Sequence, residues 1–238
     1  MAMKKINLVL IVSLMGISLS SLADWKNTSE VNILKSGGNT DVSVYNVKSE
    51  TSVDLSKHAI SLDGHYTLGE ADSTVDARNW SARLKDQYTY AEHWAVFVAQ
   101  KIAGDRFKGY EKRYFTDIGS VYKLFNLDDK KSNFEAGYRY VVEEKTDHSY
   151  THNNQLRLFG DYDQKLNKNV SFKFFSEYLK DIEIGDAWEF NFGPSVTSTL
   201  SSIFSLKVGF KGEYRNLPAV TGARKFDYTY TTGLIASF

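Results

Sequence analysis

An alternation of apolar and polar residues with period two runs through the chain from residue 24 onward. In the segment 134–142 one face is apolar or aromatic: Phe134, Ala136, Tyr138, Tyr140 and Val142. The opposite face carries Glu135 and Arg139. Successive side chains of a β-strand point to opposite faces, so this pattern predicts strands with one polar and one apolar side. We find no convincing amphipathic helix, and the chain is therefore predicted to be all-β.

The alternating runs number about twelve, and turn residues separate them. We expect strands over roughly 25–34, 42–55, 58–68, 78–90, 93–103, 112–125, 133–145, 153–163, 169–180, 186–199, 203–216 and 226–238. Short turns, such as residues 56–57 and 201–202, alternate with longer polar segments at 69–77, 104–111, 145–152 and 217–225. Short turns on one rim and longer loops on the other are typical of an antiparallel transmembrane β-barrel of the outer membrane.

The alternation alone does not say which face points outward, and a soluble barrel is the alternative. The aromatic residues Trp80 and Tyr88 lie at the two ends of one expected strand. With tilt, the height between such ends is roughly 25 Å, which matches a lipid-facing band flanked by aromatic girdles. The opposite faces of the strands are rich in long charged side chains, as a water-filled interior requires. We therefore predict a membrane barrel of about twelve strands.

The two ends of the chain carry targeting features. Lys4 and Lys5 precede an uncharged apolar stretch over residues 6–19, and Ala23 completes a small-residue cleavage motif. This stretch is too short to span a bilayer as a helix, so we predict a cleaved signal peptide over 1–23 and a barrel domain over 24–238. The last strand ends on an aromatic residue and resembles the insertion signal of bacterial outer-membrane proteins, carried here by Tyr230, Leu234 and Phe238. The expected partners are the barrel-assembly machinery and outer-membrane lipid.

Composition excludes several functional classes. The chain has no cysteine, which removes disulfides, thiolate metal sites and thiol catalysis. Its 29 basic and 29 acidic residues balance, so it lacks the positive charge of a nucleic-acid binder. We find no zinc-protease, phosphate-loop or serine-hydrolase motif, and we predict no cofactor, no metal and no enzymatic activity.

The enzymatic alternative is a barrel-borne lipid-modifying hydrolase. Only the segment Asp147-His148-Ser149, with His152 and Asn153 close by, brings suitable residue types together. His148 and His152 could also supply two metal ligands, but a zinc site needs a third or fourth. A further alternative is ligand binding or adhesion through the surface segments 104–110 and 217–222. The sequence Gly37-Gly38-Asn39 is interpreted as turn chemistry.

The polar faces of the predicted strands define the candidate functional site, which is the charged interior. Taken together, these faces hold eleven basic and ten acidic residues. The residues that we expect to form an interior charge network are Arg83, Lys85, Glu135, Arg139, Arg157, Asp161, Glu189, Lys207, Lys211 and Glu213. Their near balance favours ion pairs that neutralise and stiffen the interior. It is also compatible with a narrow pore for small solutes that has weak charge selectivity.

Some residues do not fit the pattern. Asp86 lies on the apolar face of its strand, and Pro194, which cannot donate to a sheet, indicates a bulge. The runs 93–103 and 112–125 are apolar on both faces, so their register cannot be assigned from the sequence.

Several short motifs resemble those of a bacterial family of salt-induced outer-membrane proteins, whose domain has no assigned function. They are Gly38-Asn39-Thr40-Asp41, residues 58–64 with Gly69-Glu70-Ala71-Asp72, residues 105–113, Gly137-Tyr138-Arg139-Tyr140 and Thr231-Thr232-Gly233-Leu234. The resemblance covers the whole chain after the signal peptide. It implies a small outer-membrane barrel with salt- or osmotically linked expression, and it supplies no catalytic residues.

Overall fold

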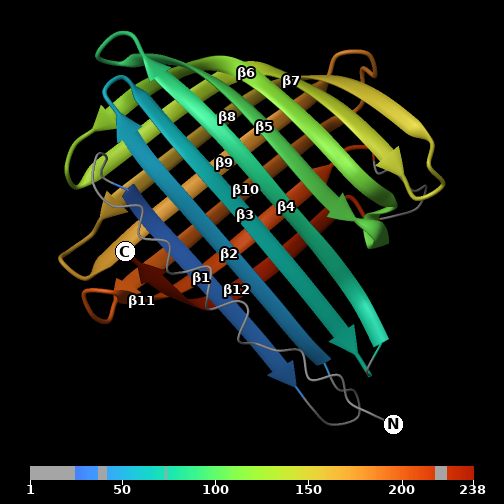
Figure 1. Cartoon of the computed structure of the whole chain (residues 1–238), viewed down its shortest axis with the longest axis horizontal. Coiled ribbons are helices and arrows are strands. Elements are labelled where there is room, and N and C mark those ends of the chain that lie inside the picture. The colour runs from blue at the N-terminus through green and yellow to red at the C-terminus, as the bar shows by residue number, and fades with distance from the viewer. Residues whose placement is uncertain (1–24, 37–41, 73, 218–223) are drawn as a thin grey trace.

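Twelve antiparallel strands form a closed barrel in a computed structural model, which describes residues 25–36, 42–72, 74–217 and 224–238 (Figure 1). The predicted all-β fold and strand number are confirmed. The strands are β1 (Trp25–Ser36), β2 (Val42–Leu55), β3 (His58–Ala71), β4 (Thr74–Thr89), β5 (Trp94–Asp105), β6 (Tyr110–Asn126), β7 (Lys130–Lys145), β8 (Tyr150–Lys165), β9 (Val170–Asp181), β10 (Trp188–Thr199), β11 (Phe204–Arg215) and β12 (Phe226–Ser237). The predicted signal peptide and the Gly37-Gly38-Asn39 turn lie outside the described residues.

Each strand pairs with its neighbours in the chain, and β12 returns to β1 to close the barrel. The start of β1 and the end of β12 lie on one rim, together with the tight turn at Ser56 and Lys57. This is the rim of short turns that the sequence predicts. In barrels of this kind the short-turn rim faces the periplasm and the opposite rim faces outward.

The predicted long loop over residues 69–77 is wrong. Strand β3 continues to Ala71 and β4 begins at Thr74, with a register shift between Gly69 and Glu70. Most of the residues assigned to the loop are therefore paired in the β3–β4 hairpin, whose tip lies at the lower right of Figure 1 beside the ends of β1 and β2. Polar composition suggested a loop, but backbone pairing does not require apolar side chains once the strands leave the lipid.

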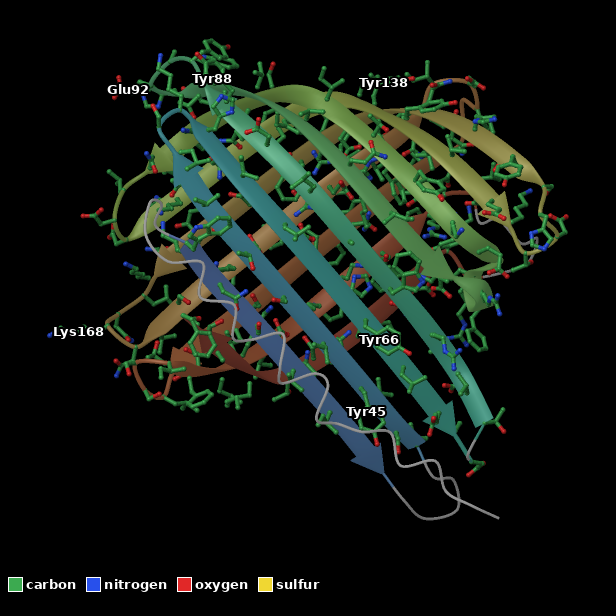
Figure 2. All side chains as sticks on the ribbon, in the orientation of Figure 1. Tyr45, Tyr66, Tyr88, Glu92, Tyr138 and Lys168 are labelled. Carbon is green, nitrogen blue, oxygen red and sulfur yellow. The ribbon has the colours of Figure 1, made fainter. Side chains whose placement is uncertain are left out.

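The outer surface of the barrel is apolar and aromatic. Residues such as Leu62, Leu84, Val98 and Ile118 are more than half exposed there. Tyr45, Tyr66, Tyr88 and Tyr138 lie on the outer surface (Figure 2), and of these Tyr45 and Tyr88 are near the ends of their strands. A band of this kind is stable only against lipid, and closure leaves most strand backbone without an edge. No helix among the described residues is long and apolar enough to cross a membrane.

The structure resolves the register of β5 and β6. Ala95 lies opposite Val121, Phe97 opposite Gly119 and Ala99 opposite Asp117. Ala95, Phe97, Ala99 and Val121 form a buried cluster inside the barrel, whereas the alternate residues of both strands face outward. Both faces read as apolar in the sequence because one packs inside the barrel and the other contacts lipid.

The bulge predicted at Pro194 is wrong. Pro194 lies opposite Phe174 on β9 within an uninterrupted register. On the β11 side, the pairs Phe192–Gly212 and Ser195–Gly209 also belong to one register. Proline is tolerated here without an inserted residue.

Asp86 does lie on the outer face, as predicted, and it has a partner. The Nδ1 atom of His58 is 3.0 Å from each carboxylate oxygen of Asp86. Both residues are close to the short-turn rim, and the His58 ring packs 5.0 Å from that of Tyr88. A polar pair at the edge of the lipid layer costs less than one at its centre, because water and head groups are within reach.

Candidate functional site

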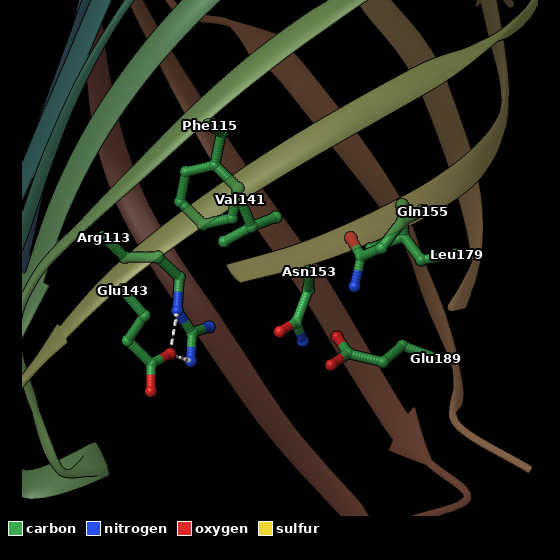
Figure 3. Close-up of a pocket in the computed structure, with 8 residues that line it drawn as sticks. All are labelled: Arg113, Phe115, Val141, Glu143, Asn153, Gln155, Leu179 and Glu189. Atoms are coloured by element: carbon green, nitrogen blue, oxygen red, sulfur yellow. Dashed lines mark hydrogen bonds and ion pairs between the residues drawn. The ribbon is translucent and has the colours of Figure 1, made fainter. Parts of the chain in front are cut away.

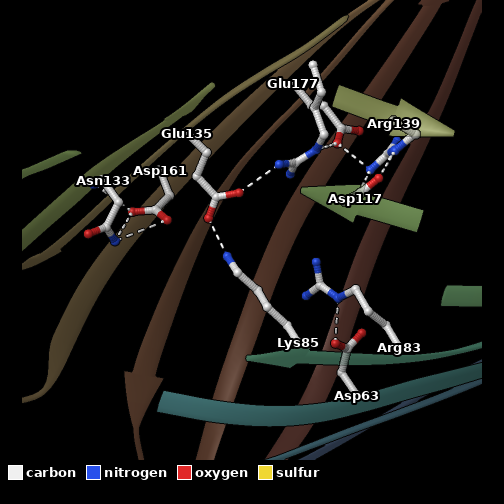
Figure 4. Close-up of polar contacts among 10 residues, drawn as sticks. Asp63, Arg83, Lys85, Asp117, Asn133, Glu135, Arg139, Asp161 and Glu177 are labelled. Carbon is white, nitrogen blue, oxygen red and sulfur yellow. Dashed lines mark hydrogen bonds and ion pairs between the residues drawn. The ribbon is translucent and has the colours of Figure 1, made fainter. Parts of the chain in front are cut away.

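A chain of ion pairs lines one side of the barrel interior, on strands β4 to β9 (Figure 4). The Lys85 ammonium contacts Glu135, and the other carboxylate oxygen of Glu135 accepts a 2.7 Å hydrogen bond from Arg157. Arg157 Nε donates to Glu177 at 2.6 Å. Glu177 is shared with Arg139, whose guanidinium also donates two hydrogen bonds to Asp117, at 2.7 and 2.8 Å. Six charged side chains from β4, β6, β7, β8 and β9 thus form one continuous network.

Strand register brings these groups together. Asp117 lies directly opposite Arg139, and Arg157 lies opposite Gly137, which has no side chain to obstruct it. The network is buried: Arg157 and Glu135 are each only 4% exposed. A buried charge is stable only when it is paired and hydrogen-bonded, and every member of this network meets that condition.

Aromatic rings complete this wall. The Lys85 ammonium lies 4.6 Å from the centre of the Phe97 ring, and the Arg157 guanidinium lies 4.9 Å from that of Phe159. A cation over an aromatic face is attracted by the ring electrons, more strongly where water is excluded. The rings and the apolar cluster on β5 and β6 therefore fill the space around the charges.

Two further predicted residues on this side have other partners. Arg83 Nε donates to Asp63 at 2.7 Å, as a separate pair between β4 and β3. Asp161 accepts hydrogen bonds from the backbone and side-chain nitrogens of Asn133, both at 3.1 Å. The prediction placed Asp161 among the ion pairs, but its carboxylate is hydrogen-bonded to the amide groups of Asn133.

The opposite wall, on β10, β11, β12, β1 and β2, carries separate pairs. Lys207 contacts Glu30 at 2.8 Å and Lys211 contacts Glu213 at 3.1 Å. Glu189 lies 3.5 Å from Arg215. About half of the Lys211 side chain is exposed, at 49%. Glu189, Lys211 and Glu213 are therefore paired within β10 and β11, whereas Lys207 reaches Glu30 on β1. The ion pairs of these four predicted residues are separate from the buried network.

A pocket lies in the interior toward the outward rim (Figure 3). It is lined by Arg113, Phe115, Val141, Glu143, Asn153, Gln155, Leu179 and Glu189. Arg113 Nε donates to Glu143 at 2.6 Å on one side of it. Its volume of about 80 Å³ is enough for a few water molecules and far below that of a typical small-molecule site. It is a recess too small for a typical small-molecule ligand.

The three residues of the predicted insertion signal lie on the outer face of the last strand or directly after it. Tyr230 is 74% exposed, Leu234 46% and Phe238 61%. The backbone of Phe238 exchanges two hydrogen bonds with Asn27, at 2.9 and 3.0 Å, and so joins the end of the chain to β1. Their role as an insertion signal stays a prediction.

The residues of the hydrolase alternative do not form a nucleophile–base pair. The Ser149 hydroxyl donates a hydrogen bond to Asp147 at 2.6 Å, and the Ser149 backbone N–H donates a second one. Together the two bonds lower the pKa of the Asp147 carboxyl. His148 lies 3.4 Å from Glu144, whereas His152 contacts the Tyr140 hydroxyl at 3.0 Å. These contacts hold together the turn between β7 and β8 and the ends of the two strands. In the described part of the chain, no cluster of three or more histidine or acidic residues could hold a metal ion.

The surface segment 104–110 is folded onto the barrel. Asp105 accepts hydrogen bonds from the backbone of Phe107 and Lys108, both at 3.1 Å, and begins the short 3-10 helix η2 (Arg106–Lys108). The helix ends at Gly109, whose φ of 86° suits glycine. Phe107 remains exposed. Most of the second surface segment, 217–222, lies outside the described residues.

Sequence reasoning missed a hydrogen-bonded cluster where β1 meets β12. Glu30 accepts from Lys207 and also from Asn32, at 3.1 Å. Asn32 in turn donates a hydrogen bond to Asn46, at 3.3 Å, and Asn46 donates one to Thr67. Residues 30, 32 and 46 alternate with outward-facing residues in the same way as the predicted set, so the period-two pattern could have revealed them.

The family model described as "Protein of unknown function, DUF481" matches residues 30–238, which is nearly the whole barrel. The chain belongs to this family. The membership agrees with the resemblance drawn from the short motifs and with the small twelve-stranded barrel. It assigns no activity. No curated protein matches the chain.

Solved porin structures share the fold at low sequence identity. The NanC porin is 9% identical with a TM-score of 0.51, and the alignment covers 90% of this chain and 98% of that one. The KdgM porin is 10% identical with a TM-score of 0.52, over 90% of this chain and 99% of that one. A second KdgM structure, in complex with disordered oligogalacturonate, is 11% identical with the same TM-score, over 89% and 99%. These likenesses establish a porin-like barrel fold.

Proposed function

We propose that the protein is a narrow, weakly selective channel of the bacterial outer membrane that passes small solutes and has no enzymatic activity. The observation that carries this proposal is the asymmetry of the interior. One wall is filled by the buried network from Lys85 to Asp117, whereas the other presents hydrated side chains such as Lys211. A passage along the hydrated wall would be narrower than the backbone barrel.

Charge balance supports weak selectivity. Strong anion or cation selection requires rings of one sign, and here acids alternate with bases on both walls. A related fold has been solved with an acidic oligosaccharide, but the paired interior of this chain favours small solutes over a polyanion. The apolar outer band supports an outer-membrane location. The family resemblance implies expression linked to salt or osmotic stress. The proposal therefore includes a role of the protein in the envelope under those conditions.

Single-channel recording in a planar bilayer tests the proposal. The refolded barrel, verified by a heat-dependent gel shift, should give discrete conductance steps in symmetric KCl. In a KCl gradient the reversal potential should stay close to zero. A folded barrel that conducts no current would overturn the channel, and a strongly shifted reversal potential would overturn its weak selectivity.

A further inference from the structure

The closure of the barrel between β1 and β12 is incomplete. Four residue pairs join the strands, from Thr28–Ser237 to Val31–Leu234, in addition to the bonds between Asn27 and Phe238. Within the described ranges, no residue of β1 after Val31 pairs with β12. In Figure 1, β1 (dark blue) and β12 (dark red) diverge beyond this point. The stretch without pairing among the described residues, 32–36 of β1 and the facing 229–233 of β12, is called the open seam below.

The open seam lies in the half of the barrel that is nearer the outward rim. Strand backbone that faces lipid must be hydrogen-bonded, because each unsatisfied group costs several kcal/mol in hydrocarbon, on the order of 4–8 for an amide. The register of the four existing pairs, if continued, would place Ile33 opposite Thr232. Pairing in this register would close the seam, and while it is open something must satisfy its polar groups.

Cationic side chains line the inner side of the seam. Lys207 of β11 reaches past β12 to contact Glu30 of β1, which is possible because its partner on β12 is Gly233. Lys48 lies opposite Glu30 on β2, and its electrostatic neighbours are Glu30, Lys207 and Lys211. No carboxylate of the described residues forms an ion pair with Lys48. The interior beside the seam thus has an ammonium group available to an anion.

A polar atom without a partner lies at the same place. Asn32, which is 8% exposed, leans toward Gly233, and its Oδ1 is the buried side-chain atom for which the described residues provide no hydrogen bond. The amide nitrogen of Asn32 is already held by Glu30 and Asn46. The remaining oxygen can accept a hydrogen bond from a water or from a ligand hydroxyl that enters at the seam.

The outer side of the seam is aromatic. The rings of Tyr228 and Tyr230 lie 5.7 Å apart, and the Phe210 ring lies 5.1 Å from that of Tyr230. Tyr230 is the most exposed of these residues. This cluster presents apolar area to an acyl chain, while its phenol groups suit the polar boundary of the lipid layer.

We propose that the open seam is a lateral gate that admits an amphiphile with an anionic head group and an acyl chain. The head group binds Lys48 on the inner side and the chain lies against Tyr228 and Tyr230 in the outer leaflet. This passage runs between interior and lipid, so it is independent of the solute flow along the barrel axis. It requires the seam to open and does not require the axial channel to conduct.

Engineered cysteines can lock the seam, since the chain has no native cysteine. The variant Ile33→Cys with Thr232→Cys spans the open seam in the continued register. The variant Ser29→Cys with Ala236→Cys spans an existing pair on the same outer face and is the matched control. In lipid nanodiscs the control should cross-link almost completely under mild oxidation, whereas the seam variant should cross-link several-fold more slowly. Equal rates would overturn the open seam.

Binding is then measured with spin-labelled stearate, whose nitroxide spectrum shows an immobilised component when it contacts protein. Locking 33 to 232 should lower that component to the level set by lipid around the rest of the barrel, and locking 29 to 236 should leave it unchanged. Lys48→Gln should weaken binding several-fold, with Lys173→Gln at the short-turn rim as control, and the methyl ester of the probe should bind as weakly. Displacement by unlabelled stearate or by lysophosphatidic acid identifies a carboxylate or a phosphate head group. An unchanged signal in the locked protein, or displacement by neither competitor, overturns the gate.

A KCl conductance measurement on the same locked protein separates this proposal from the proposed channel. If the locked protein still conducts but no longer binds stearate, both the lateral gate and the axial channel are supported. Stearate binding in a protein that never conducts overturns only the axial channel.

Discussion

The two walls of the barrel use charge in different ways. On β4 to β9 the charges are buried, share partners and enclose apolar side chains, as the contact between Arg157 and Phe159 shows. On β10 and β11 the ion pairs are separate from one another, and about half of the Lys211 side chain beside Glu213 is exposed. The same residue types therefore form a structural network on one side and a polar lining on the other. What differs is burial, which weakens screening by water and makes an unpaired charge costly.

The walls also differ in closure. From β4 to β9 every strand pairs along most of its length, whereas β1 and β12 pair over a few residues at one end. The filled wall thus provides the rigid part of the barrel. The proposed solute path and the proposed lateral gate both lie on the hydrated wall.

Removing one buried base should have the largest effect. Arg157→Ala leaves Glu135 and Glu177 without their shared partner, which costs about 3–5 kcal/mol because the carboxylates are buried. The matched variant Arg215→Ala removes a partly exposed partner of Glu189, 3.5 Å away, and should cost less than about 1 kcal/mol. Urea unfolding in lipid vesicles, followed by the gel shift, measures both.

Equal destabilisation by these two variants would mean that the walls do not differ energetically. The reversal potential is a second readout. If the buried network is structural, Arg157→Ala should change selectivity little relative to its effect on unfolding. A large change of reversal potential with unaltered unfolding would place Arg157 in the permeation path instead.

The seam should be sensitive to a single methyl group. A Cβ added at Gly233 would lie 1.9 Å from the Asn32 side-chain oxygen. Gly233→Ala must therefore displace Asn32, and overpacking of this kind costs about 1–3 kcal/mol. Gly185→Ala, where a Cβ meets no atom within 4 Å, is the control. Unfolding of both variants in urea checks the difference, and an unaffected Gly233→Ala protein would show that the contact at the seam is dispensable.

The smallest expected effect is on ion selectivity. Lys211→Gln removes one hydrated positive charge and leaves Glu213 to act alone, so the reversal potential in a KCl gradient should move modestly toward cation selectivity. The free energy of unfolding should change by less than about 0.5 kcal/mol, as for most surface substitutions. A shift toward anion selectivity would contradict the assignment of this side chain to the permeable wall.

Most of the barrel could be predicted from the sequence, because the period-two pattern assigns residues such as Arg139 and Tyr138 to opposite faces of one strand. The alternation could not resolve β5 and β6, where Phe97 packs inside and Val98 faces lipid. It also placed Glu135 and Arg157 in an interior charge network but could not tell which residues each of them would pair with. Pairing depends on the register between neighbouring strands. The alternation within a single strand contains no information about that register or about the incomplete seam.

Substituted-cysteine accessibility during single-channel recording tests the central claim most directly. Thr229→Cys lies on β12 opposite Lys211, exposed on the hydrated wall, and Ala99→Cys lies in the buried cluster, where the native residue is 4% exposed. A charged, thiol-reactive methanethiosulfonate reagent should reduce the conductance of open Thr229→Cys channels in discrete steps and leave Ala99→Cys channels unchanged. Block at position 99 with no effect at position 229 would contradict the account, because ions would then pass along the wall that the ion pairs fill.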